Sequence, residues 1–105
     1  MVRIMLACSA GMSTSLLVTK MQEAAKTANV EAEIWAIPEA DIEKNKGKFD
    51  ICLLGPQVRF KLKEVTKKAN GEYPVEVIGM TDYGTMNGKA VFEFAMKVYN
   101  DFYNK

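Results

Sequence analysis

Cys8 is the side chain of this sequence best suited to act as a nucleophile. It ends an apolar run, and the loop that follows leads into a helical pattern and consists of Ser9, Ala10, Gly11, Met12, Ser13, Thr14 and Ser15. Small residues let consecutive backbone N–H groups point toward one anion, and a following helix adds the unpaired amides and positive dipole end of its N-terminus. The stretch therefore predicts a cradle for a phosphoryl group, whose field favours the thiolate form of Cys8. A cysteine that ends a buried strand can also be inert packing, and this alternative stays open here.

The composition removes several classes of function. Lys and Arg number 14 and Asp and Glu number 13, and the net charge of +1 gives no general attraction to nucleic acid or to a membrane surface. No apolar run approaches the roughly 20 residues of a membrane span and no signal-peptide pattern is present, so we expect a cytoplasmic protein. Histidine is absent, which excludes Ser–His and Cys–His pairs. Since Cys8 and Cys52 are not at a metal-ligand spacing either, we expect no metal and no cofactor.

The elements that must position Cys8 are alternating strands and helices within one domain, residues 1–105. The patterns predict strands at residues 2–7, 30–37, 49–54 and 75–78. They predict helices at residues 16–28, 39–45, 56–69 and 91–102, with a loop at residues 79–88. The first of these helices is expected to bury Leu16, Leu17, Met21, Ala24, Ala25 and Ala28. This alternation predicts an α/β fold, an open four-stranded parallel sheet with helices on both faces and residues 30–37 near a sheet edge.

Candidate side chains from other segments should gather around Cys8, because the carboxyl ends of parallel strands line the ligand crevice. The converging segments are the loop after Cys8, the turn at Pro38, residues 55–57 and residues 82–84. Gln57 is a candidate donor to a phosphoryl oxygen, or it only helps to start its helix. Asp82 with Tyr83 is a candidate for the general acid of a phosphatase-like site, or it only caps its loop. Cys52 lies within an apolar strand and is interpreted as packing.

The loop after Cys8 is neither of the common nucleotide-binding loops, because it lacks their glycine spacing and the lysine of a P-loop. Its arrangement matches the cysteine phosphatase loop, in which an arginine is the sixth residue after the cysteine. In this chain that residue is Thr14. Without an arginine fork to stabilise hydrolysis, such a loop should hold a phosphoryl group and hydrolyse it poorly. A phosphocarrier, a thiol-based phosphatase or reductase and a plain anion-binding module all remain open, and the carrier is favoured.

Four segments carry a resemblance to a known family. Residues 8–17 (CSAGMSTSLL), 53–58 (LLGPQV), 74–78 (PVEVI) and 83–84 (YG) closely resemble the lactose/cellobiose/chitobiose enzyme IIB family of the bacterial phosphoenolpyruvate-dependent sugar phosphotransferase system. The resemblance extends over essentially the whole chain. It implies a four-stranded parallel sheet flanked by helices, with a phosphatase-like cysteine loop after the first strand.

The same resemblance implies a role for the cysteine. In this family it accepts a phosphoryl group from a phosphohistidine of enzyme IIA and passes it to a sugar that enters through the membrane enzyme IIC. Cys8 matches the phosphorylated cysteine, and Ser9 to Ser15 match the phosphate loop. The implied substrate is a β-linked disaccharide, with cellobiose, lactose and chitobiose all open. Contact with the membrane is expected only through the partner, and a small thiol phosphatase-like hydrolase is the alternative function.

Overall fold

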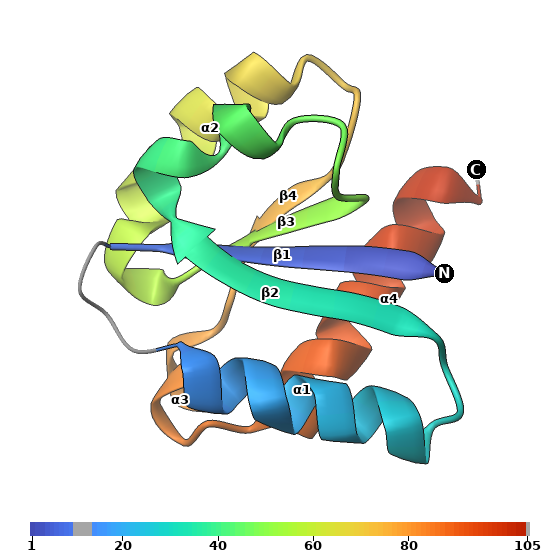
Figure 1. Cartoon of the computed structure of the whole chain (residues 1–105). Helices are drawn as coiled ribbons and strands as arrows, with labels where there is room; N and C mark the ends of the chain where they lie inside the picture. Colours follow the sequence, from blue (N-terminus) through green and yellow to red (C-terminus); the bar gives the residue numbers. More distant parts are fainter. Residues whose placement is uncertain (10–13, 105) are drawn as a thin grey trace.

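A computed structural model of the chain, which describes residues 1–9 and 14–104, contains a parallel sheet of four strands (Figure 1). The strands are β1 (Val2–Cys8), β2 (Ala32–Pro38), β3 (Ile51–Leu54) and β4 (Val75–Val77). Their spatial order is β2-β1-β3-β4 and each neighbouring pair is parallel. The predicted fold class is thereby confirmed, and β2 lies at a sheet edge as its alternating pattern predicted.

Helices cover both faces of this sheet. They are α1 (Ser15–Thr27), α2 (Leu62–Ala69), α3 (Met80–Gly84) and α4 (Gly88–Tyr103), with 3-10 turns η1 (Glu39–Asp41), η2 (Glu43–Asn45) and η3 (Pro56–Lys61). Figure 1 shows α1 and α4 together on one face and α2 on the other. Among the described residues, no helix combines the length and apolarity that crossing a membrane requires.

The central strand β1 is buried on both faces and contributes to two cores. Ile4 and Leu6 pack among the side chains of α1 and α4, whereas Met5 and Ala7 pack in a second cluster with those of α2. Successive side chains of a strand point to opposite faces, so an uninterrupted apolar run is what a strand covered on both sides requires. This double burial holds β1, and hence Cys8 at its carboxyl end, in a fixed position.

At the opposite end of the sheet, a polar network joins three segments. The Asp50 carboxylate accepts hydrogen bonds from the Arg3 backbone N–H at 2.8 Å and from the Arg3 guanidinium at 2.9 Å. The Tyr103 hydroxyl donates to the Asp50 carbonyl oxygen at 2.6 Å. The start of β1, the residue before β3 and the end of α4 are therefore tied together at the amino edge of the sheet.

Several predicted elements differ from the structure. The helix predicted at residues 39–45 consists of the two 3-10 turns η1 and η2, and the predicted loop at residues 79–88 contains the helix α3. Leu16 is exposed, because α1 buries a single row formed by Leu17, Met21 and Ala25. Leu16 shares the neighbouring row with Lys20 and faces solvent.

Candidate functional site

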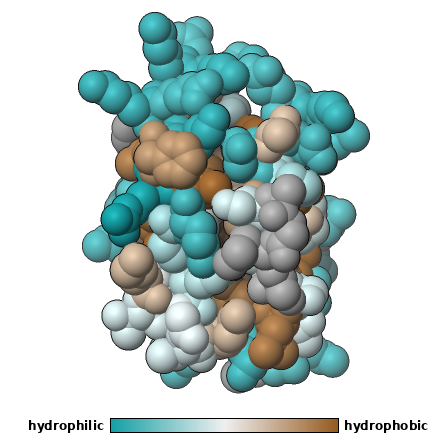
Figure 2. Space-filling view, turned by 90° about the vertical axis from the view of Figure 1, so that its left-hand side faces the viewer, coloured by the Kyte–Doolittle hydropathy of each residue, from teal (hydrophilic) through white to brown (hydrophobic). Residues whose placement is uncertain are grey.

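Cys8 is a free, buried cysteine at the last position of β1, between two neighbouring strands. Pro38 is its register partner on β2. On the other side, the Gly55 backbone N–H after β3 donates to the carbonyl oxygen of Ala7 at 2.8 Å. The thiol is therefore held at the carboxyl edge of the sheet, where parallel α/β proteins bind their ligands. Figure 2 faces this edge.

Thr14 brings the start of α1 to the thiol. The Cys8 Sγ donates to the Thr14 Oγ1 at 3.8 Å. Thr14 is the N-cap residue of α1, yet its side chain makes no capping hydrogen bond, and no acidic residue occupies the first helical turn. Neither the Thr14 side chain nor a first-turn carboxylate therefore competes with an anion for the first-turn amides, which carry the partial positive charge of the helix end. Cys8 thus contacts the N-cap residue of the helix that follows its loop, and the anion cradle itself stays a prediction.

Thr14 also occupies the position that carries the arginine in cysteine phosphatases. Its side chain is only 6% exposed, and its hydroxyl is against the thiol. The longer side chain of an arginine would not fit here unless the neighbouring side chains moved. This site therefore differs from a phosphatase loop in volume as well as in charge. Ser9 is half-buried beside Cys8 and Ser15 is exposed at the first position of α1. The predicted cradle residues Ala10, Gly11, Met12 and Ser13 lie outside the described residues.

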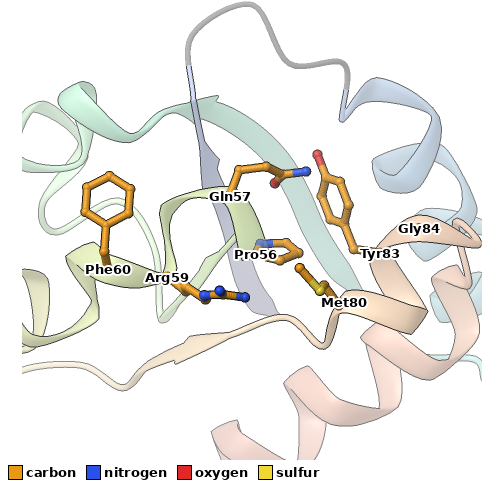
Figure 3. A pocket seen from close by; sticks show the side chains of 7 residues that line it. All are labelled: Pro56, Gln57, Arg59, Phe60, Met80, Tyr83 and Gly84. Carbon is orange, nitrogen blue, oxygen red and sulfur yellow. The ribbon is translucent and has the colours of Figure 1, made fainter.

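Because Gly55 has no side chain, Cys8 and Gln57 can both approach its backbone closely. A Cβ built on Gly55 would lie 3.1 Å from the Cys8 Cβ and 3.1 Å from the Gln57 Oε1. Only hydrogen fits at this position without moving one of these neighbours. Gln57 is exposed and its carboxamide points toward Tyr83 (Figure 3). The predicted convergence of residues 55–57 on Cys8 is thereby present in the structure.

Tyr83 lies on α3 and is 6% exposed. Burial raises the pKa of its hydroxyl, the negative charge of a Cys8 thiolate raises it further, and the nearby Gln57 side chain acts in the opposite direction. Although Gln57 is close enough to influence the pKa, it does not meet hydrogen-bond geometry. Within the described part of the chain, the Tyr83 hydroxyl is buried without any hydrogen-bond partner.

Asp82, the neighbouring candidate, is placed differently. Its backbone carbonyl accepts from the Asn87 N–H at 2.9 Å, and its Oδ2 lies 3.8 Å from the position of a Cβ on Gly79. The contacts described for Asp82 are therefore with its own turn, and none joins it to Cys8 within residues 1–9 and 14–104.

An open groove of about 550 Å³ adjoins Gln57 and Tyr83. Its lining residues are Pro56, Gln57, Arg59, Phe60, Met80, Tyr83 and Gly84 (Figure 3). Phe60 and Met80 are 74% and 65% exposed, and Figure 2 shows apolar surface among hydrophilic groups on this side of the molecule. The groove was not predicted from the sequence, although Phe60 falls outside the buried row of its predicted helix and was a usable signal.

The second cysteine is inert packing in this structure, as interpreted from the sequence. Cys52 is fully buried in β3 within the core on the α2 side, and burial raises the pKa of its thiol to about 12. Across the described ranges, no three side chains of the kinds that bind metals lie together as a metal site requires.

Fold and site together define an α/β protein with a free cysteine at the carboxyl edge of its parallel sheet. A more specific assignment follows from comparison with known proteins. The chain belongs to the lactose/cellobiose-specific IIB subunits of the sugar phosphotransferase system (PTS), whose family model matches residues 3–94. It is thus a sugar-specific IIB component of that system, as the resemblance implied.

Relatives cover nearly the whole chain. It is 46% identical over 99 residues to the oligo-beta-mannoside-specific EIIB component of Bacillus subtilis (strain 168), covering 93% of this chain and 96% of that protein. It is 48% identical over 103 residues to the galactose-specific EIIB component of Lactococcus lactis subsp. cremoris (strain MG1363), covering 92% and 95%.

Solved structures share the architecture. The cellobiose-specific IIB component from Borrelia burgdorferi superposes with a TM-score of 0.79 at 40% identity, covering 95% of this chain and 93% of that one. The lactose-specific IIB domain from Streptococcus pneumoniae gives a TM-score of 0.83 at 17% identity, covering 93% and 97%. The latter likeness shows the fold alone, which is retained although most residues differ.

Proposed function

We propose that Cys8 carries a phosphoryl group from a phosphohistidine of enzyme IIA to a sugar that enters through the membrane enzyme IIC. In the first step the Cys8 thiolate attacks phosphorus, the P–S bond forms, and the N–P bond breaks with its electron pair remaining on the imidazole. In the second step a sugar hydroxyl oxygen attacks phosphorus, the P–S bond breaks to return the thiolate, and the hydroxyl proton leaves to solvent. The placement of Cys8 at the sheet edge against Thr14 and the start of α1 carries this proposal.

The rest of the chain is consistent with such a relay. Because the sequence has no histidine, a phosphohistidine donor has to belong to a partner. The residues from Ser9 to Ser15 are proposed to surround the phosphoryl oxygens with backbone amides. These displacements need no cofactor and no nucleic acid. We place the protein in the cytoplasm, in contact with the membrane only through enzyme IIC.

A β-linked disaccharide is the proposed class of sugar. The relatives named above are specific for oligo-beta-mannoside and galactose at nearly equal identity to this chain, and a third, 48% identical, for cellobiose. Similar IIB chains thus serve different sugars, which fits a division of labour in which the membrane partner selects the sugar.

The alternative is a small thiol phosphatase-like hydrolase. Such an enzyme would use the same phosphocysteine but release free phosphate to water. Thr14 argues against it, because a buried hydroxyl stands where an arginine would stabilise the hydrolytic transition state.

Intact-mass spectrometry after incubation with phosphorylated enzyme IIA tests the proposal. Wild type should gain one phosphoryl group that persists and that prior alkylation of the thiol prevents. Cys8→Ser should gain less than about a tenth as much, because a serine hydroxyl is not ionised and no histidine is present to activate it. Cys52→Ser is the matched control and should be phosphorylated like wild type. Rapid release of free phosphate would favour the hydrolase, and a Cys8→Ser protein that is phosphorylated normally would reject the site.

A further inference from the structure

The buried hydroxyl of Tyr83 lacks the partner that such a group normally has. Its oxygen is shielded from solvent and makes no hydrogen bond of acceptable geometry in the described part of the chain, although the Gln57 carboxamide is close enough to lower its pKa. Burying a hydroxyl without a hydrogen bond is unfavourable, and nearly all buried polar groups in native proteins are satisfied. A phenylalanine would fill the same volume without this penalty. The Tyr83 hydroxyl therefore keeps hydrogen-bonding capacity for a group that is not among the described residues.

The surroundings of the hydroxyl identify the chemistry of that partner. Tyr83 lies on α3, whereas Thr14, at the start of α1, contacts the Cys8 thiol directly. Gln57 points toward Tyr83 (Figure 3). Its Oε1 and the Cys8 Cβ both lie 3.1 Å from the position that a Cβ on Gly55 would occupy. The influence of the Cys8 charge on the pKa of Tyr83 is a further sign of this proximity. Because that pKa is raised, the phenol stays protonated at neutral pH and is a donor.

We propose that the Tyr83 hydroxyl donates a hydrogen bond to an oxygen of the phosphoryl group on Cys8, and that the Gln57 carboxamide N–H donates to a neighbouring oxygen. This inference rests on the proposed function and assigns a role to residues outside the cysteine loop. A phosphoryl group on sulfur exposes three oxygens, each of which can accept hydrogen bonds. Charge-assisted hydrogen bonds to such oxygens are stronger than those between neutral groups.

This role and a purely structural role make opposite predictions for Tyr83→Phe. The variant removes only the hydroxyl, so the unphosphorylated protein should be as stable as wild type or more stable, because no hydrogen bond is lost. The phosphorylated form should lose one donor. A tyrosine that served only packing would leave the phosphorylated form unaffected.

The test is an equilibrium measurement of phosphoryl transfer. Wild type, Tyr83→Phe and the control Tyr73→Phe are each equilibrated with phosphorylated enzyme IIA, and the ratio of phosphorylated to unphosphorylated protein is read by intact-mass spectrometry. Tyr73 is a half-buried tyrosine that packs against Phe49 on the α2 side. We expect the ratio to fall roughly tenfold for Tyr83→Phe and to stay unchanged for Tyr73→Phe.

A second measurement uses wild type alone and so does not depend on the folding of a variant. With carbon-13 labelled tyrosine, the NMR titration of Tyr83 should move to higher pH once Cys8 is phosphorylated, because a dianion opposes loss of the donated proton. An unchanged transfer ratio in folded Tyr83→Phe, or an unchanged titration in phosphorylated wild type, overturns the inference. A wild-type protein that accepts no phosphoryl group overturns the proposed function and this inference with it. If wild type is phosphorylated but the transfer ratio or the Tyr83 titration is unchanged, the inference is overturned and the proposed function stands.

Discussion

Gly55 shows how a residue without a side chain shapes the site. Its backbone is extended, with φ −64° and ψ 152°, so alanine would be conformationally acceptable. The constraint is one of space, because a Cβ would meet the Cys8 Cβ and the Gln57 Oε1 at 3.1 Å each. The glycine therefore sets how closely the segment after β3 approaches the reactive thiol.

Gly55→Ala should slow phosphoryl acceptance by about tenfold, because small displacements of reacting groups have large effects on rate. Its free energy of unfolding should fall by about 1 to 2 kcal/mol from overpacking. Gly79→Ala is the matched control, since Gly79 also has an extended backbone and its Cβ would make only an ordinary contact at 3.8 Å. Single-turnover transfer kinetics and urea unfolding measure the two effects. Equal transfer rates in both variants would contradict the role assigned to Gly55.

The sequence was sufficient to predict that Cys8 ends a strand and lies near the start of the following helix, because strand, loop and helix are contiguous in the chain. It also predicted that Thr14 replaces the phosphatase arginine. It did not predict that the Tyr83 hydroxyl is buried without a hydrogen bond among the described residues, or that Cys8 and Gln57 both lie close to Gly55. Both arise where segments far apart in sequence approach within a few ångströms, and spacing within one segment carries no information on such distances.

At the scale of elements, α1 and α4 come into close contact at Gly88, the first residue of α4. A Cβ on Gly88 would lie 2.5 Å from the backbone carbonyl carbon of Lys20 and 2.7 Å from the backbone nitrogen of Met21. Both obstacles are backbone atoms, which cannot move aside as a flexible side chain can. The helix start must therefore carry glycine for α4 to reach its packed position.

Gly88→Ala should lower the free energy of unfolding by roughly 2 to 3 kcal/mol. The thermal midpoint should fall by about 10 °C for a chain of this size. Gly84→Ala, where a Cβ would meet nothing within 4 Å, should change stability by less than about 1 kcal/mol. Calorimetry on both variants makes the comparison, and equal midpoints would show that the two helices separate at little cost.

Elements with a distinctive apolar pattern were predictable, and α3 was not. The strands are apolar or alternating runs, even the three residues of β4, and α4 is long enough to show its helical period. The five residues of α3 (Met80–Gly84) follow a glycine and include an aspartate, and such residues are equally typical of a loop. Their helical conformation depends on tertiary packing, because isolated helices of this length are unstable.

For the molecule as a whole, the network around Asp50 links stability to pH. Partial burial opposes ionisation of Asp50, but hydrogen bonds and the charge of Arg3 outweigh this and hold the pKa of the carboxyl below its ordinary value. A carboxyl whose pKa is lower in the folded state contributes stability above its unfolded pKa, and this contribution disappears as pH falls through the folded value. Since the ion pair is partly exposed, the contribution is modest.

Asp50→Asn should lower the free energy of unfolding by about 1 kcal/mol at pH 7. The difference from wild type should shrink between roughly pH 5 and pH 3, because wild type loses its charged carboxylate there. Urea unfolding of both proteins across this range measures the effect. A difference that grows on acidification would have the wrong sign for a carboxyl with a lowered pKa.

The hydrogen bond from Tyr103 to the Asp50 carbonyl oxygen also determines how the protein can be handled. It anchors the end of α4 at the amino edge of the sheet, and Figure 1 shows the start of β1 and the end of α4 on the same side of the molecule. The seven residues of β1 separate that side from the thiol by roughly 20 Å. A biosensor chip or fluorescent label coupled next to the start of β1 or the end of α4 should therefore leave the edge that carries Cys8 facing solution and open to partner proteins.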